Sequence, residues 1–161
     1  MSICCFAGHN MIYDDNIKSE IYNLCVNLIT NENVNEFFVG NYGEFDLLCG
    51  NIISRLKDKY KDIKLHLVIP YITKNINENK NDIYKKYDSI IIPEMNENTP
   101  NNVKIIKANE YMIKKSQFVI CYVYYSWGGA FKTYNYAKRK NINIINIAEK
   151  YPNESSSSKF N

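Results

Sequence analysis

Two short segments of the chain are almost continuously apolar. Residues 65–69 read Leu-His-Leu-Val-Ile, and residues 118–123 read Phe-Val-Ile-Cys-Tyr-Val. A strand with one face in water alternates apolar and polar residues, whereas a strand of a parallel sheet covered on both faces is apolar at nearly every position. The two segments therefore predict a central parallel sheet with helices on both faces.

Similar segments recur along the chain, separated by stretches with helical periodicity. Strands are predicted at residues 3–7, 36–39, 64–69, 89–92, 118–123 and 142–147. Apolar residues at helical spacing and helix-favouring composition predict helices at residues 16–30, 45–60, 103–115 and 130–140. This alternation predicts an α/β fold, a single Rossmann-like, doubly wound, mainly parallel sheet with right-handed crossovers.

Two polar stretches do not follow this alternation. Residues 73–86 are rich in Asn and Lys. They permit either a flap over a site or a plain solvated connection, and the second interpretation is favoured. Residues 151–161 have the composition of a linker. The predicted organisation is one domain over residues 1–150, followed by a disordered tail over 151–161.

Composition argues against several classes of protein. The chain has no signal-peptide pattern and no apolar run of membrane-spanning length, which predicts a cytoplasmic protein without membrane partners. Five cysteines in mostly apolar segments, two histidines and no Cys-x-x-Cys pair predict reduced thiols, no metal and no cofactor. The net charge of +3 is spread along the chain without a basic block, so a nucleic-acid partner is not expected.

The loop after the fifth predicted strand carries the most specific signal. In an open parallel sheet the ligand lies beyond the carboxyl ends of the strands. Gly128 and Gly129 stand between a strand and a helix, where paired glycines let a phosphate approach free backbone N–H groups at a positive helix end. Lys132 and Thr133 follow and offer a charge and a hydroxyl. A tight turn without a ligand is the competing interpretation.

The other post-strand loops have the same two interpretations, turn or ligand contact. His9 is a candidate to orient a ligand or to be a structural residue, and Tyr42 is a candidate to stack on a base or to cover the sheet edge. Glu94 is placed to hold a ribose hydroxyl or to be a solvated carboxylate. The complete set of expected ligand-binding residues comes from the loops after the strands and the start of the following helix: Gly8, His9, Gly40, Tyr42, Gly43, Glu94, Trp127, Gly128, Gly129, Ala130, Lys132 and Thr133.

Five motifs in this order resemble the SLOG (SMF/DprA-LOG) superfamily. They are residues 4–9 (Cys-Cys-Phe-Ala-Gly-His), 38–46 (Phe-Val-Gly-Asn-Tyr-Gly-Glu-Phe-Asp), 69–71 (Ile-Pro-Tyr), 92–94 (Ile-Pro-Glu) and 127–133 (Trp-Gly-Gly-Ala-Phe-Lys-Thr). The match is most similar to the YpsA-like or DUF1273 branch of small bacterial and phage proteins. The resemblance implies a Rossmann-like fold, a homo-oligomer such as a dimer or tetramer, and recognition of nucleotides, nucleotide-derived signals or nucleic acid.

Departures from the superfamily pattern bear on the function. Relatives commonly have arginines where this chain has Asn10 and Ala108, which removes two phosphate partners that the resemblance implies. The hydrolase branch places a catalytic Glu after its glycines, and residues 133–136 here are Thr-Tyr-Asn-Tyr. The function expected first is binding of a nucleotide or nucleotide-derived small molecule. The alternative is an N-glycosidic bond hydrolase, a phosphoribohydrolase using Glu94 or Asp46, and a weaker one is single-stranded DNA binding.

Overall fold

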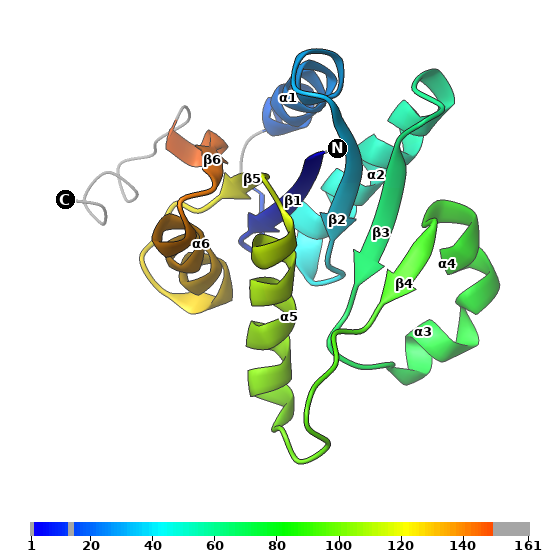
Figure 1. The fold of residues 1–161 in the computed structure, drawn as a ribbon, viewed down its shortest axis with the longest axis vertical. Helices are drawn as coiled ribbons and strands as arrows, with labels where there is room; N and C mark the ends of the chain where they lie inside the picture. Colours follow the sequence, from blue (N-terminus) through cyan, green and yellow to red (C-terminus); the bar gives the residue numbers. More distant parts are fainter. Residues whose placement is uncertain (1, 13–14, 150–161) are drawn as a thin grey trace.

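The computed structural model describes residues 2–12 and 15–149 and contains one six-stranded sheet (Figure 1). The strand order is β4-β3-β2-β1-β5-β6, and every neighbouring pair is parallel. The strands are β1 (Ser2–Gly8), β2 (Val34–Val39), β3 (Lys64–Val68), β4 (Ser89–Ile91), β5 (Phe118–Tyr122) and β6 (Asn143–Asn146). The helices are α1 (Ile17–Asn31), α2 (Gly43–Lys59), α3 (Lys74–Glu78), α4 (Lys80–Lys86), α5 (Asn101–Lys115), α6 (Gly128–Lys140) and the 3-10 turn η1 (Ile147–Glu149). The predicted α/β, Rossmann-like parallel sheet is confirmed.

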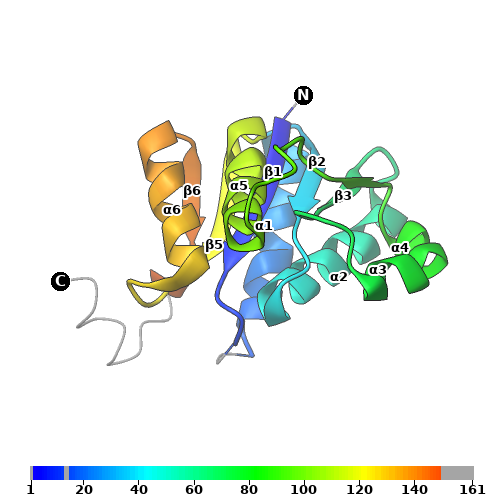
Figure 2. The same cartoon turned by 90° about the horizontal axis from the view of Figure 1, so that it is seen from below.

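Helices cover both faces of the sheet, as Figure 2 shows. The central strand β1 alternates its side chains between the two layers. Cys4 and Phe6 pack into the cluster that contains the buried residues of α1 and α2, whereas Cys5 and Ala7 pack into the cluster of α5 and α6. Because both faces are buried, β1 is apolar at every position from Ile3 to Ala7.

Residues 73–86 form a mostly exposed connection between β3 and β4, which agrees with the preferred interpretation, but this connection contains the two short helices α3 and α4, which were not predicted. Thr73 caps α3 by accepting a hydrogen bond from the Ile76 N–H at 3.3 Å. Ile76 is buried and Ile83 packs against the same core cluster. The apolar residues Ile76, Ile83 and Tyr87 recur at helical spacing, a signal masked in the sequence by the surrounding Asn and Lys.

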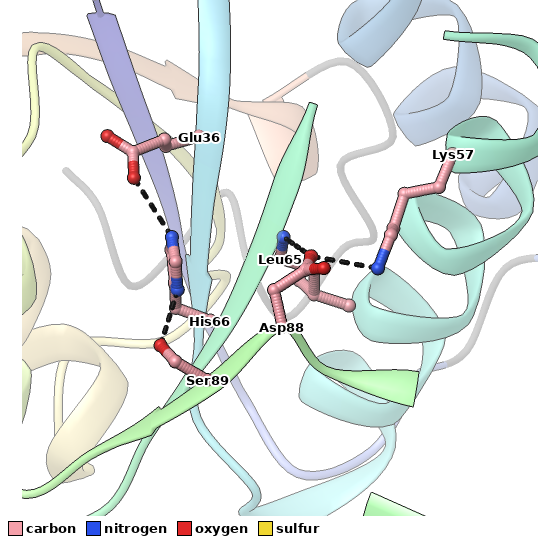
Figure 3. A network of polar contacts seen from close by, with 6 residues as sticks. All are labelled: Glu36, Lys57, Leu65, His66, Asp88 and Ser89. Atoms are coloured by element: carbon pink, nitrogen blue, oxygen red, sulfur yellow. Dashed lines mark hydrogen bonds and ion pairs between the residues drawn. The ribbon is translucent and has the colours of Figure 1, made fainter. Parts of the chain in front are cut away.

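Two polar networks fix the edge strand β4 to its neighbours (Figure 3). Asp88 Oδ2 accepts hydrogen bonds from Lys57 Nζ on α2 and from the Leu65 N–H on β3, both at 2.8 Å. On the other face His66 bridges three strands, with Nε2 at 2.9 Å from Glu36 Oε1 and Nδ1 at 2.6 Å from Ser89 Oγ. The three-residue strand β4 is therefore anchored by side chains as well as by its ladder to β3.

Two further sequence predictions concern the C-terminal tail and the absence of membrane-spanning segments. The predicted tail at residues 151–161 lies outside the described residues, so the domain boundary stays a prediction. Among the described residues, no helix combines the length and apolar character needed to traverse a bilayer.

Candidate nucleotide-binding site

The switch point of the sheet lies between β1 and β5. After β1 the chain builds β2, β3 and β4 on one side, and then returns to place β5 and β6 on the other. The loops that follow β1 and β5 therefore leave in opposite directions from neighbouring strand ends. In sheets of this kind the ligand binds in the crevice that opens there.

His9 joins the two loops at this switch point. His9 is 3% exposed, and its backbone N–H donates a hydrogen bond to the Tyr122 carbonyl at 3.1 Å. Its Nε2 accepts from the Tyr125 N–H at 3.4 Å, and its ring stacks on Tyr125 with centroids 3.5 Å apart. The structural interpretation of His9 is thus well supported, because a buried ring with these contacts holds the loops and has little surface for a ligand.

The Tyr125 ring extends this stack toward solvent. The Tyr125 ring also stacks on the Trp127 ring, with centroids 4.3 Å apart and an interplanar angle of 27°. Trp127 is 64% exposed, the largest exposed fraction among the big hydrophobic side chains of the described residues. A stack of His9, Tyr125 and Trp127 that ends in an exposed indole is a platform on which a flat aromatic ligand can add.

The two glycines at the start of α6 differ in conformation and surroundings. Gly128 has φ +89°, in the left-handed region that favours glycine. At Gly129 an added Cβ meets no atom within 4 Å. The fold requires glycine at 128, whereas nothing in the described structure fills the space beside 129.

The first turn of α6 has the features of an anion site. It holds no acidic residue and Trp127 provides no side-chain cap, whereas the first turn of α2 contains Glu44 and Asp46. The N–H groups of a helix start are positively polarised and bind phosphate readily. The turn therefore combines donors and open space.

Lys132 and Thr133 are placed differently from the sequence expectation. The helix begins at Gly128 and not near Ala130, so Lys132 lies one turn into α6, where it lines a groove of about 200 Å³ between α5 and α6. The Thr133 hydroxyl is buried and donates to the Gly129 carbonyl at 2.9 Å. Ala130 packs into the α5 and α6 cluster. Thr133 thus stabilises the turn in this geometry.

The loop after β2 uses its glycines for packing. An added Cβ on Gly40 lies 2.9 Å from Asp46 Oδ2. Gly43 has φ +86°, and an added Cβ there would overlap Asn10. Gly8 is similar, since an added Cβ there overlaps the Phe45 ring. These three candidate glycines therefore have structural reasons independent of any ligand.

A hydrogen bond between Asp46 and Tyr42 closes the same loop. Asp46 Oδ2 accepts from the Tyr42 N–H at 3.0 Å, and burial raises the pKa of the Asp46 carboxyl to about 7. Burial and the hydroxyl of Tyr71 raise the pKa of Tyr42 to about 12. Tyr42 is 40% exposed and lies at the carboxyl end of β2, one strand from β1. Asp46 fixes the loop and is too buried to meet a substrate.

Glu94 is not brought to the glycine turn. It follows β4, which is separated from β1 by two strands and from β5 by three. At about 4.8 Å per strand, the end of β4 lies about 14 Å from β1 and about 19 Å from β5. Glu94 therefore does not reach Gly128, and the other weak catalytic candidate, Asp46, is buried in the first turn of α2.

The residues that the sequence interpretation missed are Tyr124, Tyr125 and Asn146. Asn146 Oδ1 accepts from the Val123 N–H at 3.1 Å, and its Nδ2 donates to the Val123 carbonyl at 3.0 Å. This pair fixes the chain where it leaves β5 toward the stack. The run of aromatic residues after β5 was visible in the sequence, but its pairing with His9 depends on the strand order.

The structure shows the surroundings of Asn10 and Ala108, the two positions at which relatives commonly have arginines. Ala108 is 3% exposed and packs in the cluster of α5 and α6, so a larger side chain there would have to displace packed neighbours. Asn10 is exposed, and its backbone carbonyl accepts a hydrogen bond from the Glu44 N–H at 2.8 Å.

Within the described residues no group of three His, Cys, Asp or Glu side chains is placed to hold a metal.

Comparison with known proteins identifies the fold. DNA processing protein A (DprA) from Streptococcus pneumoniae matches with a TM-score of 0.65 and 12% identity, over 89% of this chain and 49% of that one. A DprA structure from Helicobacter pylori, described for its single-stranded DNA binding mode, matches with a TM-score of 0.61 and 13% identity, over 89% of this chain and 63% of that one. The chain has the Rossmann-like fold of DprA.

This chain spans about half to under two thirds of the DprA chains that it matches. No protein-family model and no curated protein matches it. The DprA likeness agrees with the SMF/DprA-LOG resemblance at the level of fold. The YpsA-like branch and the homo-oligomer stay predictions.

Proposed function

We propose that the chain binds a nucleotide unit at the carboxyl ends of β1 and β5. A phosphate lies on the first turn of α6, against the N–H groups beside Gly129, and the base stacks on the exposed face of Trp127. The observation that carries the proposal is Gly129, an exposed glycine at a helix start without acidic residues. An added Cβ there meets no atom within 4 Å, so packing does not require glycine and a phosphate can approach the N–H groups.

The position of the stack supports the base contact. Trp127 is the residue that directly precedes α6, so an aromatic surface and a phosphate site adjoin in the chain. Tyr125 and His9 hold the indole from behind, which reduces the entropy lost when a base stacks on it. Base stacking on an aromatic side chain contributes about 1–3 kcal/mol.

Calorimetry against mononucleotides, dinucleotides and cyclic ADP-ribose tests the proposal. We expect binding by at least one of them, and a loss of about ten- to a hundredfold in affinity for Trp127→Ala. Tyr84→Ala is the matched control, since Tyr84 is 58% exposed and lies on α4, away from the switch point. No binding across the panel, or equal losses in both variants, contradicts the proposal.

A further inference from the structure

A glutamate, a histidine and a serine form a continuous hydrogen-bonded chain across three neighbouring strands (Figure 3). Glu36 lies on β2, His66 on β3 and Ser89 on β4. The His66 ring stands between the other two side chains, with Nε2 2.9 Å from Glu36 Oε1 and Nδ1 2.6 Å from Ser89 Oγ. The ring of Phe38, which packs in the cluster of α5 and α6, contacts His66 with centroids 5.4 Å apart. The group therefore lies on the α5 and α6 side of the sheet.

The partners of His66 determine which nitrogen of the neutral ring carries the proton. An ionised carboxylate only accepts hydrogen bonds, so Nε2 donates to Glu36. Nδ1 then has a free lone pair, and the Ser89 hydroxyl donates to it. An acid, an imidazole and a hydroxyl in this order make the serine a nucleophile, because the ring can take the hydroxyl proton during an attack.

A substrate can reach this group from the face of the sheet. Figure 1 shows β3 and β4 beside α5 and not beneath it. The side chains of His66 and Glu36 are 14% and 32% exposed, and Ser89 is half-buried. Ile91 follows Ser89 by two residues and so leaves the same side of the strand, and both Ile91 and Met95 pack at the border of the α5 and α6 cluster. A small acyl group has an apolar surface there, next to the hydroxyl.

Lys64 adds a positive charge to the same face. It precedes His66 by two residues on β3, so the two side chains leave the same side of the sheet. Lys64 is exposed, and the ion pairs found in the described part of the chain join other residues. With about 3.3 Å per residue and about 4.8 Å between strands, its Cα lies roughly 8 Å from that of Ser89. A lysine side chain spans this distance, so the ammonium can stabilise an oxyanion formed beside Ser89.

We propose that Glu36, His66 and Ser89 are a second functional site, which hydrolyses esters with a small apolar acyl group. Ser89 Oγ attacks the carbonyl carbon while His66 Nδ1 takes its proton, and the ester C–O bond breaks as His66 gives this proton to the departing alcohol. Water then attacks the acyl group on Ser89 in the same way, and the carboxylic acid leaves. Glu36 is a positioning residue that holds the ring with Nδ1 free. The inference does not depend on the proposed nucleotide site.

Hydrolysis of p-nitrophenyl acetate and labelling by a fluorophosphonate test the proposal. We expect the wild-type protein to turn over the ester, and mass spectrometry to find the phosphonate on the peptide that contains Ser89. Ser89→Ala should abolish the labelling and lower kcat/KM by about a hundredfold or more. Ser89→Cys keeps a nucleophile at this position and should still release a burst of p-nitrophenol. Ser54→Ala is the matched control, because Ser54 is also half-buried but lies on α2, and it should change neither readout.

Glu36→Gln separates positioning from the anchoring of β4. A glutamine amide can donate to Nε2, which moves the ring proton to Nδ1 and removes the acceptor for the Ser89 hydroxyl. We therefore expect kcat to fall about tenfold or more with KM unchanged. Melting curves show whether each variant is folded. A purely structural group would lower the melting temperature in Glu36→Gln and leave kcat of the folded protein unchanged, which overturns the proposal.

Two further results overturn it. Ester turnover that persists in folded Ser89→Ala assigns the reaction to the imidazole alone, and labelling of a different serine removes Ser89 as the nucleophile. Absence of both turnover and labelling in the wild-type protein leaves the three residues as an anchor for β4. None of these results bears on nucleotide binding at the switch point, which calorimetry measures separately.

Discussion

Gly128 and Gly129 adjoin in the chain, yet the structure gives them different tasks. The first supplies a positive φ for the start of α6, and the second leaves a space beside the helix start. A residue with a Cβ costs roughly 1–2 kcal/mol in the left-handed region, whereas alanine in an ordinary helical turn is about 0.5–1 kcal/mol better than glycine.

The matched pair Gly128→Ala and Gly129→Ala separates fold from ligand. We expect Gly128→Ala to lower the free energy of unfolding by about 1–2 kcal/mol. Gly129→Ala should leave it equal or higher by up to about 1 kcal/mol, and weaken nucleotide binding, since the methyl group occupies the phosphate space. Urea denaturation and calorimetry measure the two effects. Unchanged affinity in a folded Gly129→Ala protein would move the phosphate away from this turn.

Asp46 makes the stability of the chain depend on pH in a defined direction. Burial raises the pKa of its carboxyl to about 7, partly offset by the hydrogen bond from the Tyr42 N–H. The folded state therefore keeps this proton to higher pH than the unfolded chain does. The stability from this group is complete below about pH 4 and is lost as the pH rises through about 7.

Asp46→Asn tests this dependence, because asparagine keeps an oxygen that accepts from Tyr42 but does not titrate. We expect the variant to gain stability relative to the wild type between pH 4 and pH 7.5, by at most on the order of 4 kcal/mol. Urea denaturation at pH 4, 5.5 and 7.5 measures the difference. Parallel pH profiles for the two proteins would contradict the assigned state of Asp46.

The sheet edge provides the opposite pH dependence. Burial raises the pKa of Asp88, but the hydrogen bonds from Lys57 and the Leu65 N–H and the charges of Lys57 and Lys64 outweigh burial, so the pKa is lowered overall. Stability from Asp88 is therefore present above the pKa of the unfolded chain and is lost as the pH falls through the lower folded value. These contacts join α2 and β3 to the start of β4.

We expect Asp88→Asn to lower the free energy of unfolding by about 1 kcal/mol or less at neutral pH, since the pair is partly exposed. The deficit should shrink as the pH falls below about 4, because the Asp88 carboxyl of the unfolded wild-type chain takes up a proton there before that of the folded state does. Denaturation at pH 7 and pH 3.5 tests this. Glu78→Gln is the control, because its ion pair with Lys74 lies on the solvated side of α3 at 3.8 Å. An equal loss in Glu78→Gln would show that the effect is not specific to β4.

At the scale of elements, all six strands were predictable. Burial on both faces leaves a nearly continuous apolar run in β1 and β5, and shorter apolar runs mark the partly exposed edge strands β4 and β6. The main helices were also found, although α6 begins two residues before the predicted start, since Gly128 and Gly129 are poor helix formers that nevertheless form its first turn. The short helices α3 and α4 were missed because three apolar residues, Ile76, Ile83 and Tyr87, hold them to the core within a polar stretch.

At the scale of the whole molecule, the sequence could not place the candidate site, because strand order decides which loops adjoin. The order β4-β3-β2-β1-β5-β6 brings His9 to Tyr125 and separates Glu94 from Gly128, although all lie in loops that follow strands. The same topology sets α5 and α6 side by side, so charge that is spread along the sequence gathers in one layer, with eight Lys and Arg side chains against one acidic residue, Glu110. Both properties depend on contacts between residues far apart in the chain.

Hydrogen exchange tests this spatial assignment across the molecule. Saturating mononucleotide should slow short-time exchange in peptides that cover residues 123–131, because the ligand accepts hydrogen bonds from N–H groups of the α6 turn. Peptides that cover residues 89–95 should not respond at short times, because the end of β4 lies about 19 Å from β5. Global stabilisation by the ligand slows only the amides that exchange through unfolding, and these are measured at long times. Protection confined to residues 89–95 would place the ligand at Glu94 and remove it from the switch point.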